Sequence, residues 1–491
     1  MKGMVMRNVS RREALTLGGS ALAGLATIFA LPGCSPAQNG QGATAAGNAE
    51  AAATTAAHEL VIDKQTGLLA RSEFVGLDQQ VTLADGTQAP AINFDNGATT
   101  PSLVTAIEEI QNQLLMYGSI GRGKGQKSAH STEAFGAARE TVLKFFGAPS
   151  DTYTCAFSGS ATDGLNKVAS TLCAGGQAVV VTTRSEHHAN DLPWRAHASE
   201  VRYVDIQPDG RLDLDQVPKL LADGKVTVVS MQAASNVTGY VHDVHAVAKL
   251  AHEAGAIMVV DGAQIASHRA FSLKGATEAE DIDFFVCSAH KMYAPFGGGC
   301  IIGKTSLMNN YVPAYRGGGM VDIVTDSDVT WLKSPDLWEA GSPNYFGAIT
   351  LGKACEALST VGFDAIQAHE QALLRKAIDG LKDIYDVVVY ADTDKIDDRV
   401  GVLTFNVQGV QPADVAEQLA GKWGIAVRQG EFCAHPLCHR LLGYSNDEFL
   451  IMMQEPNFQA PGMVRVSMGM YNTESDVDTL LKAVREIAPH A

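Results

Sequence analysis

The stretch VHAVAKLAHEAGAIMVVDGAQ, residues 244–264, decides the fold because it joins a helix, a turn and a strand in direct succession. Apolar residues recur through 244–254 with the spacing of an amphipathic helix, and Gly255 is typical of a residue that ends one. Residues 256–260 are all apolar, which indicates a short strand buried on both faces. Asp261 then stands at the point where this strand ends.

The same alternation of apolar strands and helices continues on both sides of this stretch. Such a pattern predicts an α/β fold with a mostly parallel sheet between two layers of helices. Ligands of such sheets bind beyond the carboxyl ends of the strands, so we expect the functional site just after residues 157, 183, 231, 260 and 287. The predicted strands are 153–157, 177–183, 201–205, 226–231, 256–260 and 284–287, and the predicted helices are 162–172, 191–198 and 244–254.

The pattern changes after about residue 365, where longer helices and more widely spaced strands are typical of a smaller α+β domain. The predicted helices there are 369–381, 412–419 and 474–487, and the predicted strands are 402–407, 425–428 and 464–468. We therefore expect an N-terminal segment at 58–100, a large domain at 101–365 that carries the site, and a small C-terminal domain at 366–491.

The composition is that of a globular protein. The 491 residues are 46% hydrophobic and 19% charged, which excludes wholesale disorder, a fibrous repeat and a membrane protein with many spans. The 37 Lys and Arg residues face 54 Asp and Glu residues, giving a net charge of -17. Nucleic-acid binding is not expected because it needs clustered positive charge. Eight cysteines are too few for a disulfide scaffold of this length.

The first residues have the three parts of an export signal. Arg11 and Arg12 form a twin-arginine pair, residues 14–31 are apolar and uncharged, and Leu31-Pro32-Gly33-Cys34 is similar to the lipobox of bacterial lipoproteins. We expect a signal at 1–33, a lipidated Cys34 and a flexible tether at 34–57, with the protein anchored on the extracytoplasmic side of the cell membrane. An uncleaved membrane anchor is the alternative.

Polar residues follow the ends of the predicted strands. Asp261 follows one strand and Lys291 follows another, and pyridoxal phosphate requires an aspartate for its pyridinium nitrogen and a lysine that forms an imine. Residues 158–162 open a helix whose N–H groups and hydroxyls would hold a phosphate, and His187 stands at the same edge. Each feature by itself is more often a cap, a turn or a solvated charge. Their succession at strand ends indicates a cofactor site.

These residues are part of a longer set of motifs that resembles the class V aminotransferase family. Within that family the chain is most similar to the Suf-type cysteine desulfurases and selenocysteine lyases, over about residues 90–488. The resemblance implies a fold-type-I, pyridoxal-phosphate-dependent homodimer. The motifs that carry it are Asn93-Phe94-Asp95-Asn96-Gly97-Ala98-Thr99-Thr100, Glu186-His187-His188-Ala189-Asn190, Ser235-Asn236, Asp261-Gly262-Ala263-Gln264, Ser288-Ala289-His290-Lys291, Glu339-Ala340-Gly341-Ser342-Pro343-Asn344, Arg428-Gln429-Gly430-Glu431-Phe432-Cys433, Arg465 and Tyr471-Asn472-Thr473.

The resemblance also implies how the cofactor is held. Lys291 would bind it as a Schiff base, Asp261 would pair with its ring nitrogen and keep it protonated, and His187 would stack on the ring. The other implied contacts are those of Asn236 and Gln264 with the phenolic oxygen, those of Ser160, Ala161, Thr162, Ser288 and His290 at the phosphate, and that of Ser342 with the phosphate of the partner subunit.

By the same resemblance the substrate is L-cysteine or L-selenocysteine, bound through its carboxylate by Arg465 with Arg428 and Asn236 alongside. Lys291 would take the Cα proton and the Cys433 thiolate would attack the substrate sulfur. Alanine would leave, and a persulfide would stay on Cys433 for a sulfur acceptor. The alternatives are transamination, epimerisation or C–S lysis of another small amino acid, or cofactor binding without activity.

The chain departs from the family pattern around this site. The phosphate turn reads Ser160-Ala161-Thr162 where many members have Gly-Thr-Thr, and Thr162 keeps its hydroxyl. Phe432 precedes Cys433 where Suf-type members often have histidine. Residues 445–461 add length before the strand that carries Arg465, which could reshape the mouth of the substrate site.

Cys433, His435, Cys438 and His439 lie within seven residues. Zinc sites usually combine two distant pairs of ligands, and no second pair stands elsewhere in the sequence, so we expect no metal. The spacing also lacks the Cys-x-x-Cys-His pattern of attached haem. A Cys433–Cys438 disulfide and a structural Cys433 are the alternatives to a nucleophile. The other cysteines of the body lie in apolar segments and are predicted to be core residues: Cys155, Cys173, Cys287, Cys300 and Cys355.

Overall fold

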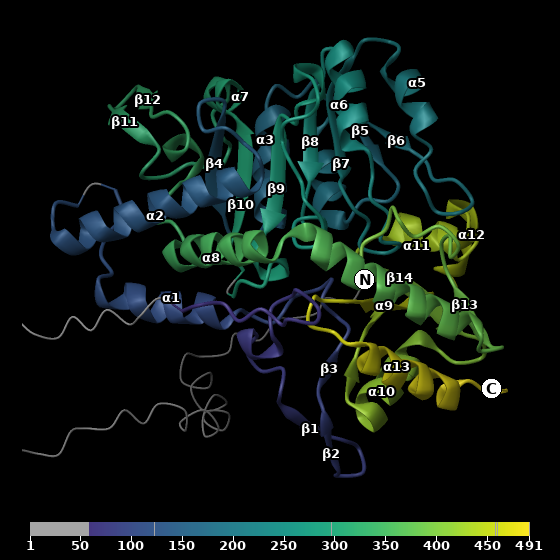
Figure 1. Cartoon of the computed structure of the whole chain (residues 1–491). Coiled ribbons are helices and arrows are strands. Elements are labelled where there is room, and N and C mark those ends of the chain that lie inside the picture. Colours follow the sequence, from purple (N-terminus) through teal and green to yellow (C-terminus); the bar gives the residue numbers. More distant parts are fainter. Residues whose placement is uncertain (1–57, 122, 296, 457, 459, 491) are drawn as a thin grey trace, which may run out of the picture. The chain divides into compact units, whose positions relative to one another are not determined.

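The computed structural model describes residues 58–490, except for residues 122, 296, 457 and 459 (Figure 1). The predicted export signal at 1–33, the lipidated Cys34 and the tether at 34–57 lie outside the described residues and stay predictions. Among the helices of the described residues, none is long and apolar enough to cross a membrane.

A seven-stranded sheet lies at the centre of the described residues (Figure 1). Its strands are β4 (Tyr153–Ser158), β5 (Val179–Thr183), β6 (Glu200–Val204), β7 (Val226–Gln232), β8 (Ile257–Asp261), β9 (Phe284–Ser288) and β10 (Gly299–Lys304). They are arranged in the order β4-β10-β9-β8-β7-β5-β6. β10 runs antiparallel to both of its neighbours, and the other pairs are parallel. The predicted mostly parallel sheet is therefore confirmed, although β10 itself was not predicted.

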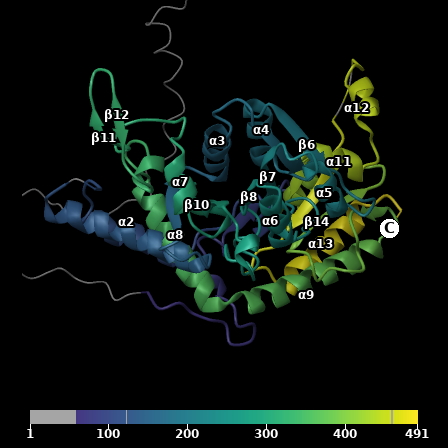
Figure 2. The same cartoon turned by 90° about the horizontal axis from the view of Figure 1, so that it is seen from above.

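Helices cover both faces of this sheet (Figure 2). They are α2 (Gln126–Phe145), α3 (Ala161–Leu172), α4 (Leu192–His197), α5 (Val217–Leu221), α6 (Val244–Glu253), α7 (Thr305–Asn310) and α8 (Tyr345–Val361), and α1 (Val104–Leu115) packs on the outside of α8. Successive strand residues point to opposite faces, so neighbours enter different cores. Cys155 of β4 packs in the core that holds Val142 of α2 and Leu351 of α8, whereas Ala156 packs in the core that holds Leu165 of α3.

A second, antiparallel sheet follows in the C-terminal part of the chain. Its elements are β13 (Val387–Val389), β14 (Val402–Val407), β16 (Arg428–Gly430), β17 (Met463–Ser467), α9 (Phe363–Lys382), α10 (Pro412–Trp423) and α13 (Glu474–Ile487). The strand order is β13-β14-β17-β16. The helices share one apolar core with the sheet, where Leu374 of α9 and Leu480 of α13 are buried with Val466. α13 begins after Thr473, whose side chain accepts a hydrogen bond from Asp476 N, and it has the predicted bounds.

The N-terminal segment pairs with this C-terminal part. β3 (Ile92–Asn93) lies parallel to β15 (Ile425–Ala426), and the next residue, Phe94, is buried in the C-terminal core. Residues 425–428, predicted as one strand, are divided between β15 and β16, so that prediction was wrong. The physical reason is that β15 pairs with β3 whereas β16 pairs with β17. Two short hairpins complete the strands: β1 (Gln80–Thr82) with β2 (Gln88–Pro90), and β11 (Val321–Val324) with β12 (Val329–Trp331).

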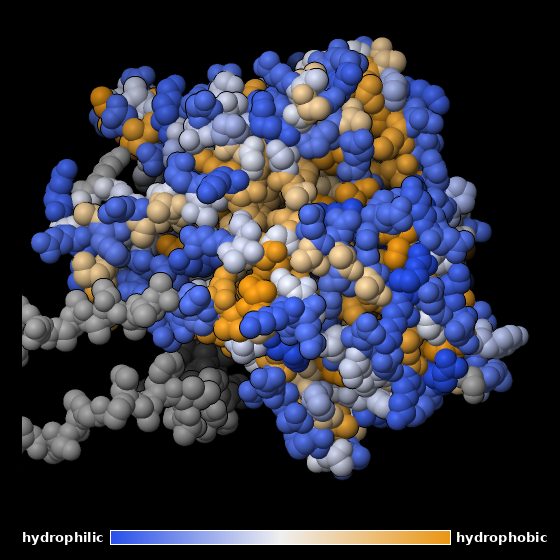
Figure 3. Space-filling model, in the orientation of Figure 1, coloured by the Kyte–Doolittle hydropathy of each residue, from blue (hydrophilic) through white to orange (hydrophobic). Residues whose placement is uncertain are grey.

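Two short helices lie between β16 and β17. α11 (His435–Leu441) follows Cys433, and α12 (Asn446–Met452) forms within residues 445–461, the segment predicted as extra length. α12 exposes apolar side chains at Leu450 and Ile451. Hydrophilic residues surround apolar residues that gather near the centre of the face that Figure 3 shows.

Candidate active site

The strands β4, β5, β7, β8 and β9 end at one edge of the central sheet, and a cavity of about 320 Å³ lies there. This is the edge at which the sequence predicts a ligand. The residues predicted for the site that line this cavity are Ser160, Ala161, Thr162, His187, Asn236, Gln264, Ser288, His290, Lys291, Arg428, Cys433 and Arg465. Asp261 lies buried at the end of β8, next to this lining, and Ser342 lines a different cavity.

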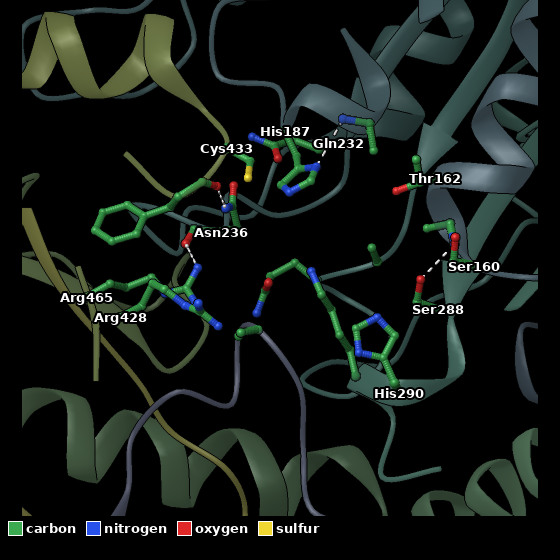
Figure 4. Close-up of a pocket in the computed structure, with 18 residues that line it drawn as sticks. Ser160, Thr162, His187, Gln232, Asn236, Ser288, His290, Arg428, Cys433 and Arg465 are labelled. Carbon is green, nitrogen blue, oxygen red and sulfur yellow. Dashed lines mark hydrogen bonds between the residues drawn. The ribbon is translucent and has the colours of Figure 1, made fainter. Parts of the chain in front are cut away.

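Two groups of labelled side chains lie at opposite ends of the cavity (Figure 4). Ser160, Thr162 and Ser288 lie at one end, and Arg428 and Arg465 lie at the other. Hydroxyls at a helix start suit a phosphate, and guanidinium groups suit a carboxylate. The cavity therefore offers two separate anion sites.

The phosphate end is built from the start of α3. Ser160 caps the helix, since its Oγ accepts a hydrogen bond from Asp163 N at 3.2 Å. Ala161 N donates to Ser288 Oγ at 2.7 Å, which fastens the helix start to the end of β9. The N–H groups and the positive end of the helix dipole would attract a phosphate at this point.

Lys291 lies directly after β9, in the short turn Ala289–Lys291. Burial lowers the pKa of its amine to about 8, although the nearby Asp261 carboxylate acts in the opposite direction. Asp261 is 4% exposed, its Oδ1 accepts a hydrogen bond from Ala263 N at 2.9 Å, and burial raises its pKa. An amine that loses its proton readily beside a buried carboxylate suits an imine-forming lysine and the partner of a cationic ring nitrogen.

His187 lies over the same cavity as a neutral ring. Ala189 N donates to its Nδ1 at 3.1 Å, so the neutral imidazole carries its proton on Nε2. Burial, together with the charge of Lys291, lowers the pKa of His187 to about 3. A neutral aromatic ring in this place suits stacking on a flat ligand.

Buried amides of the cavity have hydrogen-bonding capacity that the protein leaves unused. Asn236 Oδ1 and Gln264 Oε1 have no partner among the described residues, although Asn236 Nδ2 donates to Phe432 O at 2.8 Å. An unsatisfied buried polar atom costs about 1–3 kcal/mol, so these atoms favour a polar ligand. With a lysine, a buried aspartate and a helix start around them, the residues present fit pyridoxal phosphate.

The carboxylate end is a pair of arginines on neighbouring strands. Arg428 of β16 lies opposite Arg465 of β17, and Asp95 bridges them through contacts of 2.8 Å to Arg428 Nη2 and 3.1 Å to Arg465 Nη2. Arg465 is 3% exposed, whereas the Arg428 side chain is 49% exposed. Gly97 lies against Arg465, because a Cβ there would be 3.2 Å from its Cζ. Arg465 is therefore a desolvated and rigidly placed cation.

Cys433 reaches the cavity from a turn of unusual backbone. Phe432 and Cys433 have φ angles of 49° and 55°, a left-handed conformation that residues other than glycine seldom adopt. His188 N donates to Cys433 O at 2.7 Å and holds the turn. Cys433 and Cys438 are both free thiols in this structure, and Cys438 Sγ donates to Glu431 O at 3.3 Å.

Some lining residues had no role in the sequence analysis. Gln232, at the end of β7, is the clearest, and its position directly after residue 231 could have identified it. Its Nε2 donates to Ser185 Oγ at 3.1 Å. Phe432 was noted only as a departure, yet its ring centroid is 5.3 Å from Arg465 Cζ, which gives it a cation–π contact with this buried guanidinium. The other lining residues without a predicted role are Gly97, Ala98, Ala189 and Ala263.

Known proteins are similar to this chain over most of its length. The family model described as Aminotransferase class-V matches residues 92–480. A probable cysteine desulfurase of Halalkalibacterium halodurans is 33% identical over 422 residues, covering 84% of this chain and 96% of that protein. A cysteine desulfurase of Klebsiella pneumoniae is 34% identical over 379 residues, covering 76% of this chain and 86% of that protein.

Solved structures agree with this sequence similarity. The apo structure of a cysteine desulfurase from Thermococcus onnurineus has a TM-score of 0.73 and 28% identity, covering 82% of this chain and 95% of that chain. The cysteine desulfurase CsdA from Escherichia coli, with an S-sulfonic acid, has a TM-score of 0.70 and 30% identity. The match covers 85% of this chain and 96% of that chain. The chain therefore belongs to the aminotransferase class-V family of pyridoxal-phosphate-dependent enzymes.

Proposed function

We propose that this chain is a cysteine desulfurase or selenocysteine lyase, which converts L-cysteine to L-alanine and keeps the sulfur as a persulfide on Cys433. The observation that carries the proposal is the free, exposed thiol of Cys433 in the cavity that Lys291 also lines. Transamination and epimerisation need the lysine but have no use for a thiol there. The names of the similar proteins support the same reaction.

Pyridoxal phosphate would be held at three points of the cavity. The start of α3 with Ser288 and His290 would bind the phosphate, Asp261 would face the ring nitrogen, and His187 would stack on the ring. When bound, this cofactor supplies an electron sink that makes the Cα proton of an amino acid acidic. Gln264 and Asn236, which line the cavity, would contact the phenolic oxygen through the N–H groups of their side-chain amides.

Lys291 is suited to accept the Cα proton of the substrate. Its pKa of about 8 leaves a useful fraction of the amine unprotonated near neutral pH, which a general base requires. The cavity also holds the Arg465 charge, which lowers this pKa further, and the Asp261 charge, which raises it. Lys291 would therefore accept the Cα proton of the substrate at Nζ and return a proton when alanine forms.

Arg465 would bind the substrate carboxylate through two parallel N–H···O bonds and so place the substrate side chain near Cys433. The Cys433 thiolate would then attack the substrate sulfur. The C–S bond of the substrate breaks as the S–S bond forms, and the sulfur stays on Cys433 Sγ until a thiol or another sulfur acceptor removes it.

The test is a panel of amino acids on purified, cofactor-loaded protein without residues 1–57, with a thiol reductant present. Alanine and sulfide are measured for the unchanged protein, for Cys433→Ala and for the control Cys438→Ala. We expect alanine and sulfide from L-cysteine in the unchanged protein and in Cys438→Ala, and loss of both products in Cys433→Ala. The control separates the loss of the Cys433 thiol from the loss of a second thiol five residues away.

Equal alanine and sulfide production by Cys433→Ala would refute the proposal. Turnover of another amino acid that is unchanged by Cys433→Ala would instead indicate transamination, epimerisation or C–S lysis in the same cavity. Neither result would alter the family assignment, which rests on the match over residues 92–480.

We also infer that the enzyme is a homodimer. Ser342 does not line the cavity of Lys291, and in the described residues it lines a separate cavity with Gly159 and Asp163. This position supports a role for Ser342 in the site of a partner subunit. α1 ends in an exposed apolar run at Leu114 and Leu115, which supports a protein contact. Light scattering of Leu115→Glu, which should be monomeric, against the unchanged protein tests the inference.

We further propose that the protein is exported by the twin-arginine route and anchored by a lipid on Cys34, outside the cytoplasm. The support is the sequence of residues 1–34. Expression of the full chain and of Cys34→Ala in a bacterial host, followed by membrane fractionation and mass measurement of the mature N-terminus, tests the proposal. We expect a lipidated N-terminus at Cys34 and release of Cys34→Ala from the membrane. An unprocessed N-terminus in both would contradict it.

A further inference from the structure

The turn that carries Cys433 is flanked by three side chains with metal-binding groups. Glu431 stands just before the turn, and His435 and His439 stand after it, four residues apart on α11. Residues four apart share one face of a helix, so the two imidazoles lie side by side. One ligand atom from each of the three residues lies within 4.8 Å of the other two.

These atoms are close to the spacing of a bound ion. Glu431 Oε1 contacts His439 Nε2, and Glu431 Oε2 is 3.6 Å from His435 Nδ1. Bonds of 2.0–2.1 Å in a tetrahedral zinc site put neighbouring ligand atoms about 3.3 Å apart. Small side-chain rotations would therefore bring the three groups around one ion, without a change in the backbone.

The surroundings hold these groups in place. The Glu431 side chain is 8% exposed, and among the described residues its ion pairs are with these two imidazoles and with no lysine or arginine. The His439 ring stacks on Phe449 of α12 with centroids 3.6 Å apart, and the His435 ring packs against His188 at 4.5 Å. A nearly buried carboxylate without a permanent cation is costly, and a metal ion would offset that cost.

We propose that Glu431, His435 and His439 bind a divalent transition-metal ion, with Zn²⁺ the best match. Two imidazoles and one carboxylate suit this class of ion, and the fourth position would be open to water. The His435 side chain is 47% exposed and gives the ion a route from solvent. The proposed metal site is separate from the proposed desulfurase reaction. The expectation of no metal from the sequence was based on the spacing of Cys and His residues, whereas Glu431 supplies a carboxylate.

A bound ion would brace the Cys433 turn. It would join Glu431, on the N-terminal side of the turn, to α11 on the other side, across the two residues with left-handed backbone. The turn would then exchange its amide hydrogens more slowly. Hydrogen exchange of residues 431–439 with and without Zn²⁺ measures this effect directly.

The binding test uses the cofactor-loaded protein without residues 1–34, with Zn²⁺ alone as the probe and no L-cysteine present. Calorimetry and metal analysis after dialysis give the affinity and stoichiometry, and the visible spectrum of bound Co²⁺ gives the geometry. We expect one ion per chain, with affinity at least about tenfold weaker in His435→Ala and in Glu431→Gln, since each loses one of three ligands. His435 is exposed enough for this variant to fold.

Two matched variants separate this site from other metal binding. Cys433→Ala should keep the ion, because the thiol is not one of the ligands. His58→Ala is the second control: His58 also pairs with two carboxylates, Glu73 and Glu108, but through opposite ring nitrogens that cannot face one ion. Binding that survives in both His435→Ala and Glu431→Gln, or that is lost in Cys433→Ala, overturns the proposal. These readouts do not depend on desulfurase activity.

Discussion

Replacing Arg465 by lysine should weaken substrate binding far more than the same change at Arg428. The two residues face each other on β17 and β16 and share Asp95, but Arg465 is 3% exposed and the Arg428 side chain is 49% exposed. A lysine ammonium is a point charge that cannot form the two parallel bonds of a guanidinium with a carboxylate. The difference in burial between the two arginines then sets how much substrate binding each variant loses.

The loss at Arg465 is one charge-assisted hydrogen bond in a desolvated site. Such a bond contributes about 1.5–3 kcal/mol, so the KM for L-cysteine should rise about 10–150-fold in Arg465→Lys. An exposed ion pair contributes about 0.2–1 kcal/mol, so Arg428→Lys should raise KM less than about sixfold. Asp95 and the Asn236 carbonyl, which accepts from Arg465 Nη1 at 3.2 Å, remain to hold the lysine.

The assay is steady-state alanine formation over a range of L-cysteine concentrations, with the amount of bound cofactor measured by absorbance. Equal cofactor content in the unchanged protein and the two variants shows that the phosphate end is intact. A larger KM in Arg428→Lys than in Arg465→Lys would refute the reasoning, because the exposed arginine would then be the main carboxylate ligand.

Two further predictions concern the same cavity, and a third concerns the buried carboxyl group of Glu186. In Cys433→Ala, the exchange of the Cα proton of L-alanine for deuterium should increase as the pH rises through about 8, because Lys291 must lose its proton to act as a base; a flat profile contradicts this. Gly97→Ala should raise the KM for L-cysteine about fivefold or more, since overpacking against Arg465 costs about 1–3 kcal/mol; an unchanged KM shows that Arg465 can give way. Burial raises the pKa of Glu186 to about 8, so the folded chain keeps a proton that the unfolded chain releases and loses stability as the pH rises from about 4.5 to 8. The Tm of Glu186→Gln relative to the unchanged protein should therefore increase over this pH range, and a constant difference would show that Glu186 does not titrate there.

The central sheet could be predicted because its strands are buried on both faces. Residues 256–260 are apolar without interruption, and β8 covers almost the same residues. β10 escaped prediction because glycines stand at Gly299 and Gly303, and glycine in a strand is weak evidence for one. The glycine at 303 is required by packing, since a Cβ there would lie 2.8 Å from the Phe284 ring. Local sequence does not show that need.

The helix α8 was not predicted because it is too apolar. It is buried on most of its surface, between the sheet and α1 and α2, so its sequence lacks the polar face that marks an amphipathic helix. The site residues were easier to find than the elements, because a polar residue after an apolar strand is unusual wherever it stands. Lys291, Asp261 and His187 follow this rule. Glu431 does not follow this rule, because only the turn at Cys433 brings it near His435 and His439.

The pairing of β3 with β15 has a consequence for how the protein is made. Ile92 and Phe94 exchange backbone hydrogen bonds with Gly424, Ala426 and Ser467, which the ribosome adds more than three hundred residues later. The C-terminal core contains Phe94, so it cannot be completed by the C-terminal residues without this early strand. A nascent chain must keep this segment unpaired until the ribosome has added residues 424–467. A fragment that stops before these residues cannot bury Phe94 in this core.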